Sequence, residues 1–265
     1  MIYFKDKIVW VTGASSGIGE ALVKKLAEYG AKVILSARRE TELLRVKEAC
    51  GENGDQCILV PLDLENEKSI NDAIHKVKTL IGTVDIMINN GGISQRSLAE
   101  ETSMEVDRRL MEINYFGAIA LTKAVLPGML KIGRGNIVAV SSVAGKFGFP
   151  LRSAYSASKH AIQGYYETLG LEVKDKGVHV TIACPGRVRT EISKHALTKD
   201  GEAYDNMDLG INEGISPNKC AKKMLRAIAN ERSEILIGGK ELLMVYIKRF
   251  IPALFRKIAK NISPT

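Results

Sequence analysis

The feature that most restricts the fold of this 265-residue chain is the regular alternation of short apolar runs with longer amphipathic segments. The apolar runs are nearly continuous, which is typical of strands buried on both faces of a parallel sheet. The expected strands are Ile8–Thr12, Lys32–Ser36, Cys57–Pro61, Asp85–Asn89, Asn136–Ser141, Val178–Ala183 and Glu234–Ile237. The amphipathic segments predict helices at Glu20–Tyr29, Glu40–Cys50, Ser69–Ile81, Met104–Lys131, Ala154–Lys176 and Pro217–Asn230.

This alternation predicts the α/β fold class, with one Rossmann-type, doubly wound parallel β-sheet of about seven strands flanked by helices. The sequence contains no internal repeat and no Pro/Gly/Ser-rich linker, so we expect one domain over residues 1–240. Residues from about 190 to 216 show no clear periodicity. A long loop inside such a domain is usually functional, and we interpret this stretch, called the lid segment below, as a lid over a site.

Residues 241–265 are expected to form a basic, amphipathic C-terminal extension. Its apolar residues recur at helical spacing, and its charges are nearly all positive; they are Leu243, Ile247, Phe250, Ile251, Leu254 and Ile258, with Lys248, Arg249, Arg256, Lys257 and Lys260. Pro252 is expected to kink or split this helix. Such a helix either packs on its own domain or on a partner subunit of a homodimer or homotetramer, or lies in a membrane interface.

The formal net charge of +8 raises the question of an anionic partner. Nucleic acid has no further support, because the chain shows no recognised nucleic-acid motif and no basic face studded with aromatic residues. The cysteines have no CxxC spacing, which predicts reduced thiols and no metal site; they are Cys50, Cys57, Cys184 and Cys220.

The charged residues Lys5, Asp6 and Lys7 precede any long apolar run, so the first residues lack the apolar core of a signal peptide. No uncharged apolar stretch reaches the roughly 18 residues that a membrane span needs. We therefore expect a cytoplasmic protein, with peripheral membrane contact through the C-terminal extension as the alternative.

The segment TGASSGIGE, residues 12–20, joins the first expected strand to the first helix and has glycines at 13, 17 and 19. In a dinucleotide-binding fold this turn must be tight, and its backbone must approach a pyrophosphate placed at the helix N-terminus. The spacing here is GxxxGxG rather than GxGxxG. On its own, the motif is compatible with a cofactor site or with a tight turn only.

The end of the second strand distinguishes the two nicotinamide cofactors. An NAD-binding unit places Asp or Glu there to bind the ribose 2′-hydroxyl, whereas this chain has Ala37 followed by Arg38 and Arg39. A guanidinium can hold a 2′-phosphate by two hydrogen bonds. We therefore expect NADP(H), with Arg38 favoured over Arg39. Asp63, after the third strand, is expected either to accept a bond from the adenine amino group or to cap a helix.

Tyr155 and Lys159 stand four residues apart, which places both side chains on one face of a helix. Tyrosine is a poor proton donor at neutral pH because its pKa is about 10. A neighbouring ammonium favours the tyrosinate form and brings that pKa closer to the range in which acid–base catalysis is efficient. The pair therefore indicates a tuned phenol.

Five motifs occur together: TGASSGIG at 12–19, NNGG at 89–92, Asn114 in NYFG, Ser142 in VSSVAGK, and YSASK at 155–159. With these motifs in this order, residues 5–238 resemble a short-chain dehydrogenase/reductase, and the C-terminal third looks closest to the hydroxysteroid-dehydrogenase-like branch. The resemblance implies that Tyr155 is the acid/base and that Ser142 orients the reacting oxygen. It also implies that Lys159 binds the nicotinamide ribose and lowers the phenol pKa, while Asn114 holds a water on the proton path.

The resemblance also implies the cofactor contacts. Pro185 and Gly186 would turn the chain beneath the nicotinamide, Val188 would offer backbone bonds, and Thr190 would add a hydroxyl. The complete expected set is Gly13, Ser15, Ser16, Gly17, Ile18, Gly19, Arg38, Arg39, Asp63, Leu64, Asn90, Gly91, Tyr155, Lys159, Pro185, Gly186, Val188 and Thr190. Gly91 departs from the family, which commonly has alanine there, and is expected to add flexibility.

We expect substrate contacts from residues 93–97, from residues 144–150 and from the lid segment, with an apolar wall formed by Phe147, Phe149, Leu151 and Met207. No arginine is clearly placed to bind an acidic substrate. The sequence thus predicts NADP(H)-dependent interconversion of a carbonyl and a secondary alcohol on an apolar, lipid- or steroid-like small molecule. The alternatives are a 3-oxoacyl-carrier-protein reductase and a non-catalytic dinucleotide-binding regulator.

Overall fold

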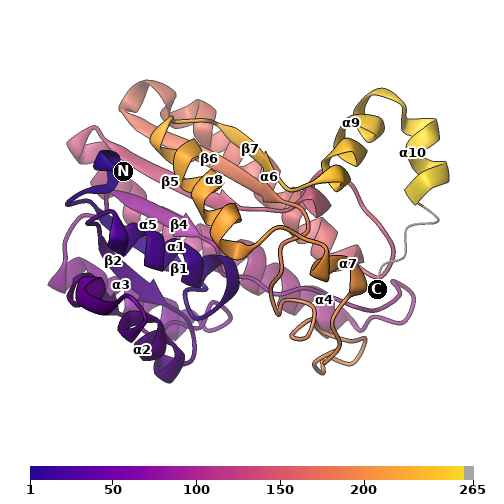
Figure 1. Cartoon of the computed structure of the whole chain (residues 1–265), viewed down its shortest axis with the longest axis horizontal. Helices are drawn as coiled ribbons and strands as arrows, with labels where there is room; N and C mark the ends of the chain where they lie inside the picture. The colour runs from indigo at the N-terminus through magenta and orange to yellow at the C-terminus, as the bar shows by residue number, and fades with distance from the viewer. Residues whose placement is uncertain (260–265) are drawn as a thin grey trace.

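The seven expected strands form one parallel sheet in the computed structural model, which describes residues 1–259 apart from the side chain of Leu209 (Figure 1). The strand order is β3-β2-β1-β4-β5-β6-β7. Their bounds are β1 (Ile8–Thr12), β2 (Lys32–Ser36), β3 (Cys57–Leu59), β4 (Ile86–Asn89), β5 (Gly135–Val140), β6 (Val178–Pro185) and β7 (Glu234–Ile237). The predicted α/β fold with a doubly wound sheet is confirmed.

The order of the strands reverses between β1 and β4, which lie side by side with Val9 paired to Ile86. In open parallel sheets, ligands bind at such a switch point, outside the carboxyl ends of the strands. The glycine-rich turn follows β1, the NNGG motif closes β4, and Ser142 follows β5. The sheet therefore gathers at one edge motifs that are far apart in the sequence.

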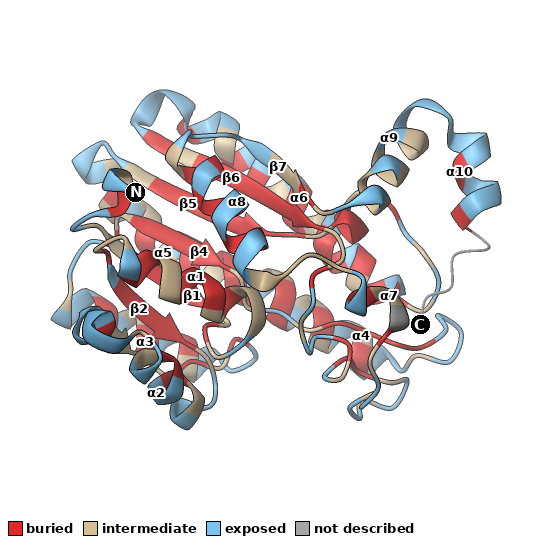
Figure 2. Cartoon of the chain, in the orientation of Figure 1, coloured by how far each residue is buried: buried red, intermediate tan, exposed pale blue. Residues whose placement is uncertain are grey.

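Helices cover both faces of the sheet, and the strands between them are buried (Figure 2). One apolar layer joins the sheet to α1 (Gly17–Glu28), α2 (Glu40–Glu48) and α8 (Pro217–Ala229). The other joins it to α3 (Glu67–Leu80), α5 (Gly117–Ile132) and α6 (Ser153–Val173). Burial on both faces explains why the strands have continuous apolar sequences.

The helix expected at Met104–Lys131 is interrupted by one wider turn. It consists of α4 (Met104–Met111), a π-helical segment (Glu112–Phe116) and α5. Such π segments occur frequently at functional sites, and this one carries Asn114. The whole run, Met104–Ile132, is long and apolar enough to cross a membrane, but half of its apolar window is buried inside the domain, as in the core helix of an α/β protein.

The described part of the C-terminal extension forms two short helices, α9 (Leu243–Phe250) and α10 (Pro252–Ala259), which extend from the body of the domain (Figure 1). The split falls at Pro252, as predicted, whereas Lys260 lies outside the described residues. Phe255 packs edge-on against Phe147 at 5.3 Å between ring centroids. Lys248 Nζ donates to the carbonyl of Lys146 at 2.8 Å. These contacts attach the extension to the loop after β5.

A buried hydroxyl ties the sheet to the helix layer that carries α6. The Tyr166 hydroxyl lies 2.7 Å from Thr122 Oγ1 and donates to the carbonyl of Ala118 at 3.2 Å. The same hydroxyl accepts a hydrogen bond from Asn89 Nδ2 at 3.1 Å. Removing one partner from a buried hydrogen-bond network leaves the others unpaired.

Tyr166→Phe is therefore expected to lower the free energy of unfolding by about 1–3 kcal/mol, measured by chemical denaturation. The control is Tyr246→Phe, because Tyr246 is 53% exposed and its change should stay within about 0.5 kcal/mol. Equal effects of the two changes would contradict the role assigned to the buried hydroxyl.

Candidate active site

The glycine turn after β1 is built by close backbone contacts. Gly13 and Gly17 have φ angles of 63° and 56°, in the left-handed region that favours glycine. A Cβ atom on Gly13 would lie 2.8 Å from the Cα atom of Gly91, and one on Gly19 would lie 2.0 Å from the carbonyl oxygen of Gly13. Because α1 begins at Gly17, the turn presents a helix N-terminus suited to an anion.

Two polar side chains hold this turn against the end of β4. Thr12 Oγ1 accepts the backbone N–H groups of Asn90 at 3.0 Å and of Gly91 at 2.9 Å. Asn90 Nδ2 donates in return to the carbonyl of Thr12 at 2.9 Å. Asn90 thus stabilises the turn from behind. Arg45, which no motif indicated, donates to the carbonyl of Ser15 at 3.1 Å and pairs with Glu20 at 2.8 Å.

The glycine at position 91 is explained by its neighbour. A Cβ atom there would lie 2.6 Å from Leu64 Cδ1, so the leucine occupies the space that the common alanine would fill. The sequence alone indicated only added flexibility at this position. The structure adds a packing reason for the substitution.

At the end of β2, Ala37 stands where an NAD-binding unit has an acid, and the exposed Arg38 and Arg39 line the same cavity as the glycine turn. Asp63 also lines it. Its Oδ1 accepts from the N–H of Glu65 at 3.1 Å, whereas Asn66 caps α3 by accepting from the N–H of Ser69 at 2.8 Å. The alternative of Asp63 as the cap of α3 is therefore wrong.

One cavity of about 530 Å³ joins these groups to the residues expected to carry out the chemistry. It is lined by every residue of the predicted cofactor set except Gly19, and by Ser142, Tyr155 and Lys159 of the predicted catalytic set. Gly19 packs within the turn instead. Among residues 1–259, no cluster of three or more His, Cys, Asp or Glu side chains is placed to hold a metal ion.

Tyr155 lies in the first turn of α6 and lines the cavity together with Ser142. Burial raises the pKa of the phenol. A hydrogen bond from Ser142 and the positive charges of Arg96 and Arg152 act in the opposite direction and lower that pKa. Ser142 Oγ also lies 3.3 Å from the carbonyl of Pro185. This bond connects the segment after β5 to the end of β6.

Lys159 lies one turn further along α6, with Nζ 5.9 Å from the centroid of the Tyr155 ring. Its ammonium donates to the carbonyl of Val140 at 2.9 Å. Burial lowers the pKa of Lys159 to about 8. Its expected effect on the phenol pKa stays a prediction. The contact of Lys159 with a ribose stays a prediction.

Asn114 lies behind the cavity rather than on its wall. In the π segment, its Oδ1 accepts the N–H of Ile93 at 2.8 Å, and its Nδ2 donates to the carbonyl of Ile93 at 3.0 Å and to Ser158 Oγ at 3.0 Å. The side chain therefore fastens the loop after β4 to α6. Its expected role in holding a water stays a prediction.

Gln95 fixes the start of α6. From the sequence, we expected substrate contacts from residues 93–97 but did not single out this side chain. It is fully buried, and its Oε1 accepts the backbone N–H groups of Ala154 at 2.9 Å and of Tyr155 at 3.3 Å. The first N–H groups of a helix need partners from outside the helix. Gln95 supplies them, and in doing so it places Tyr155.

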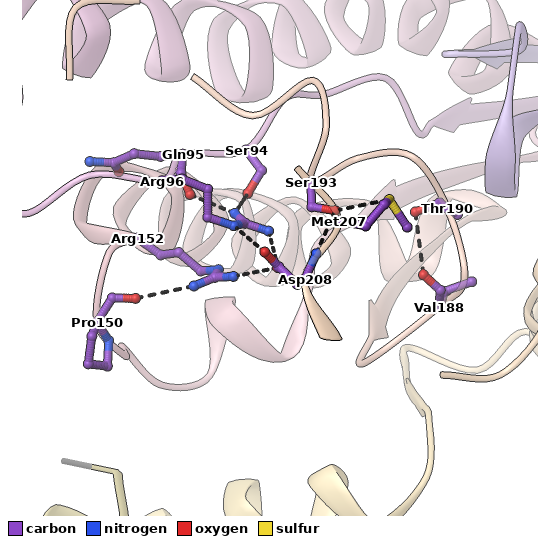
Figure 3. Close-up of polar contacts among 10 residues, drawn as sticks. All are labelled: Ser94, Gln95, Arg96, Pro150, Arg152, Val188, Thr190, Ser193, Met207 and Asp208. Carbon is purple, nitrogen blue, oxygen red and sulfur yellow. Dashed lines mark hydrogen bonds and ion pairs between the residues drawn. The ribbon is translucent and has the colours of Figure 1, made fainter. Parts of the chain in front are cut away.

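The substrate end of the cavity differs in part from expectation. Phe147 and Phe149 line it, but Leu151 and Met207 do not. Arg96 and Arg152 also line the cavity, where they bind Asp208 of the lid segment (Figure 3). The fold brings these two arginines together from the loop after β4 and from the residue before α6, a juxtaposition that the sequence did not indicate.

Comparisons with known proteins show the family of the chain. A family model described as short chain dehydrogenase matches residues 7–201. The chain is 42% identical to a Drosophila melanogaster protein named dehydrogenase/reductase SDR family protein 7-like, covering 94% of this chain and 78% of that protein. It is 40% identical to human dehydrogenase/reductase SDR family member 7, covering 93% and 75% respectively.

Two solved structures give the same picture. A short-chain dehydrogenase from Streptomyces avermitilis is 30% identical, with a TM-score of 0.82 over 96% of both chains. One from Burkholderia phymatum, solved in complex with NAD, has a TM-score of 0.84 at 24% identity, covering 100% of this chain and 99% of that one. The fold and the family model thus define an oxidoreductase of the dehydrogenase/reductase class. The chain belongs to the short-chain dehydrogenase/reductase family.

Proposed function

We propose that the protein interconverts a carbonyl and a secondary alcohol with NADP(H), using Tyr155 as the proton donor and acceptor. The observation that carries this proposal is that Ser142, Tyr155 and Lys159 line the same cavity as the glycine turn and Arg38. The residues present fit a dinucleotide, because the turn has no room for side chains at Gly13 and Gly19 and opens onto the N-terminus of α1.

The chain's own residues would act as follows. In the direction of reduction, Ser142 donates a hydrogen bond to the carbonyl oxygen, and Tyr155 donates its proton to the same oxygen as charge develops there. In the direction of oxidation, the tyrosinate accepts the proton of the alcohol. The nicotinamide cofactor, when bound, supplies or accepts the hydride. Lys159 would bind its ribose, and Pro185, Gly186, Val188 and Thr190 would bound one side of the nicotinamide.

The cofactor preference follows from the charges at the end of β2. An acid at position 37 would repel a 2′-phosphate, whereas Arg38 and Arg39 would attract one. Arg38 is assigned the closer contact. Asp63 and Leu64, which line the same end of the cavity, would adjoin the adenine.

The substrate is proposed to be an apolar, lipid- or steroid-like ketone or alcohol, because Phe147, Phe149 and Met244 line the other end of the cavity. This agrees with the resemblance to the hydroxysteroid-dehydrogenase-like branch. The 3-oxoacyl-carrier-protein reductase is the alternative, and a screen that follows NADPH absorbance with steroid ketones, lipid ketones and a 3-oxoacyl thioester separates the two. Turnover of the thioester alone would favour the alternative.

Tyr155→Phe is expected to lower kcat/KM at least about 100-fold, because general acid–base catalysis contributes on that order or more. In the unsubstituted enzyme, the rate of reduction should fall as the pH rises through the phenol pKa, whereas the rate of oxidation should rise. Tyr165→Phe, on the same helix but outside the cavity lining, is the control. Full turnover by the Tyr155 variant would contradict the acid/base role and favour a non-catalytic regulator.

Arg38→Asp is expected to change the ratio of kcat/KM for NADPH to that for NADH by about 10- to 100-fold in favour of NADH. This range corresponds to the loss of a charge-assisted hydrogen bond of about 1.5–3 kcal/mol. The matched control is Arg232→Asp, which makes the same change of charge at an exposed residue before β7. An unchanged ratio for the Arg38 variant would remove the basis for the NADP(H) preference.

The outer face of the C-terminal extension supports a membrane-peripheral or oligomeric role. Its exposed apolar residues are Leu243, Tyr246, Phe250, Ile251, Leu254 and Ile258, next to Lys248, Arg249, Arg256 and Lys257. A basic helix pair with an apolar face suits the interface of an anionic bilayer, and the same face suits a homodimer or homotetramer. We propose membrane contact at the site of action of an otherwise cytoplasmic protein.

Phe250→Asp in the full chain is expected to lower binding to phosphatidylserine-containing vesicles at least about tenfold in co-sedimentation, because a charge replaces apolar surface in the interface. The control is Leu171→Asp, because Leu171 is 78% exposed on α6, outside the extension. Equal binding by both variants excludes the membrane role. A change in molecular mass by light scattering without a change in vesicle binding would favour the subunit interface.

A further inference from the structure

A buried cluster of charged side chains connects the lid segment to the loop after β4 and to the start of α6 (Figure 3). Arg96 Nε donates to Asp208 Oδ1 at 3.0 Å, and its Nη2 binds Oδ2 of the same carboxylate. Arg152 Nη2 donates to Asp208 Oδ2 at 2.8 Å. The side chains of Arg96 and Asp208 are only 2% and 7% exposed. Charges buried to this extent are costly unless each is paired and hydrogen-bonded.

Arg96 has further anchors that do not depend on the lid segment. Its Nη1 donates to Ser94 Oγ at 2.8 Å and to the carbonyl of Gln95 at 2.6 Å. Arg152 Nη1 donates to the carbonyl of Pro150 at 3.3 Å. The guanidinium of Arg96 therefore keeps its place on the loop after β4 even when the Asp208 carboxylate is removed.

The same cluster lines the cavity that holds the Tyr155 phenol. Arg96, Arg152, Asp208 and Tyr155 all line the one cavity. Arg152 immediately precedes α6, and Gln95, the neighbour of Arg96, binds the backbone N–H of Tyr155. The positive charges of Arg96 and Arg152 lower the pKa of the phenol, against the effect of its burial.

Other polar and charged groups also surround Tyr155, among them the Lys159 ammonium, whose Nζ lies 5.9 Å from the ring centroid. The Ser142 hydroxyl is a neutral hydrogen-bond partner. The Lys159 ammonium is engaged by the carbonyl of Val140. The other titratable or charged side chains that line the cavity are Arg38, Arg39, Asp63, Arg187, Glu191, His195 and Glu241.

We propose that Arg96, held by Asp208 of the lid segment, is a positioning residue that presents positive charge to Tyr155 and so stabilises the tyrosinate left after proton transfer. This inference rests on the acid/base role proposed for Tyr155. Arg152 adds to the same field from the start of α6. Asp208 limits the positive charge that would otherwise be buried and secures the lid segment to the loop after β4.

Three variants distinguish an effect of the Arg96 charge on the phenol from an effect of loop packing. Arg96→Gln removes the charge and should raise the pKa of the Tyr155 phenol by roughly one unit. Arg96→Lys keeps the charge and should leave that pKa nearly unchanged. Asp208→Asn removes the countercharge while the other anchors of Arg96 remain, so the phenol pKa should fall or stay constant. Arg109→Gln, which breaks an ion pair with Glu65 outside the cavity, is the matched control.

The phenol is followed directly by ultraviolet difference absorbance of tyrosinate, without cofactor, as the signal of each protein minus that of the same protein carrying Tyr155→Phe. Stopped-flow pH jumps record the titration before alkaline unfolding. A rise for Arg96→Gln together with no rise for Asp208→Asn supports the proposal, since loosening of the loop would shift both in the same direction. An unchanged titration of Arg96→Gln, or an equal rise in both variants, overturns it.

If Arg96→Gln does not fold, Arg96→Lys and Asp208→Asn decide the matter, and a rise in the phenol pKa for either one overturns the proposal. The outcome is separate from that of the acid/base role, because the titration needs no turnover. Full turnover by Tyr155→Phe would overturn the proposed function while leaving the measured effect of Arg96 on the phenol intact.

Discussion

The contact between the turn after β1 and the end of β4 is the constraint on which the rest of the site depends. A side chain at Gly13 would meet the Cα atom of Gly91 at 2.8 Å, so the two backbones touch without side chains between them. Thr12 and Asn90 fix this approach by hydrogen bonds in both directions. The approach leaves the N-terminus of α1 open toward the cavity, and it sets the position from which the loop after β4 reaches the start of α6.

The loop after β4 connects the glycine turn to the start of α6 and to the lid segment. Asn114 binds both backbone polar groups of Ile93, and Gln95 supplies acceptors to the first N–H groups of α6. The next residue, Arg96, binds the lid segment through Asp208. Over four residues, a single loop thus fixes the start of the helix that carries Tyr155 and binds the lid segment through Arg96.

The sequence predicted the sheet well because a parallel strand covered on both faces must be apolar at nearly every position. The expected bounds of β1, β2 and β7 agree with the structure. The cavity lining around the glycine turn was also predictable, since these residues lie in short contiguous motifs at the ends of strands. The π segment could not be predicted from the sequence. One wider turn inside a helix shifts the spacing of apolar residues too little for the sequence pattern to show it.

The substrate end could not be predicted from local patterns. Asp208 is 112 residues from Arg96 and 56 from Arg152, so no spacing rule links them, and each alone is typical of a solvated surface residue.

Tyr155 and Lys159, in contrast, are close in the sequence. Their spacing correctly placed both on one helix and in one cavity, but spacing carries no information on which other cations lie near the phenol. That depends on where the buried charges find partners, and burial makes those partners obligatory. Lys159 finds a carbonyl at the end of β5, and Arg96 finds a carboxylate that only the folded lid segment supplies. The electrostatics of the phenol are therefore a property of the tertiary structure, whereas the identity of the phenol is a property of the motif.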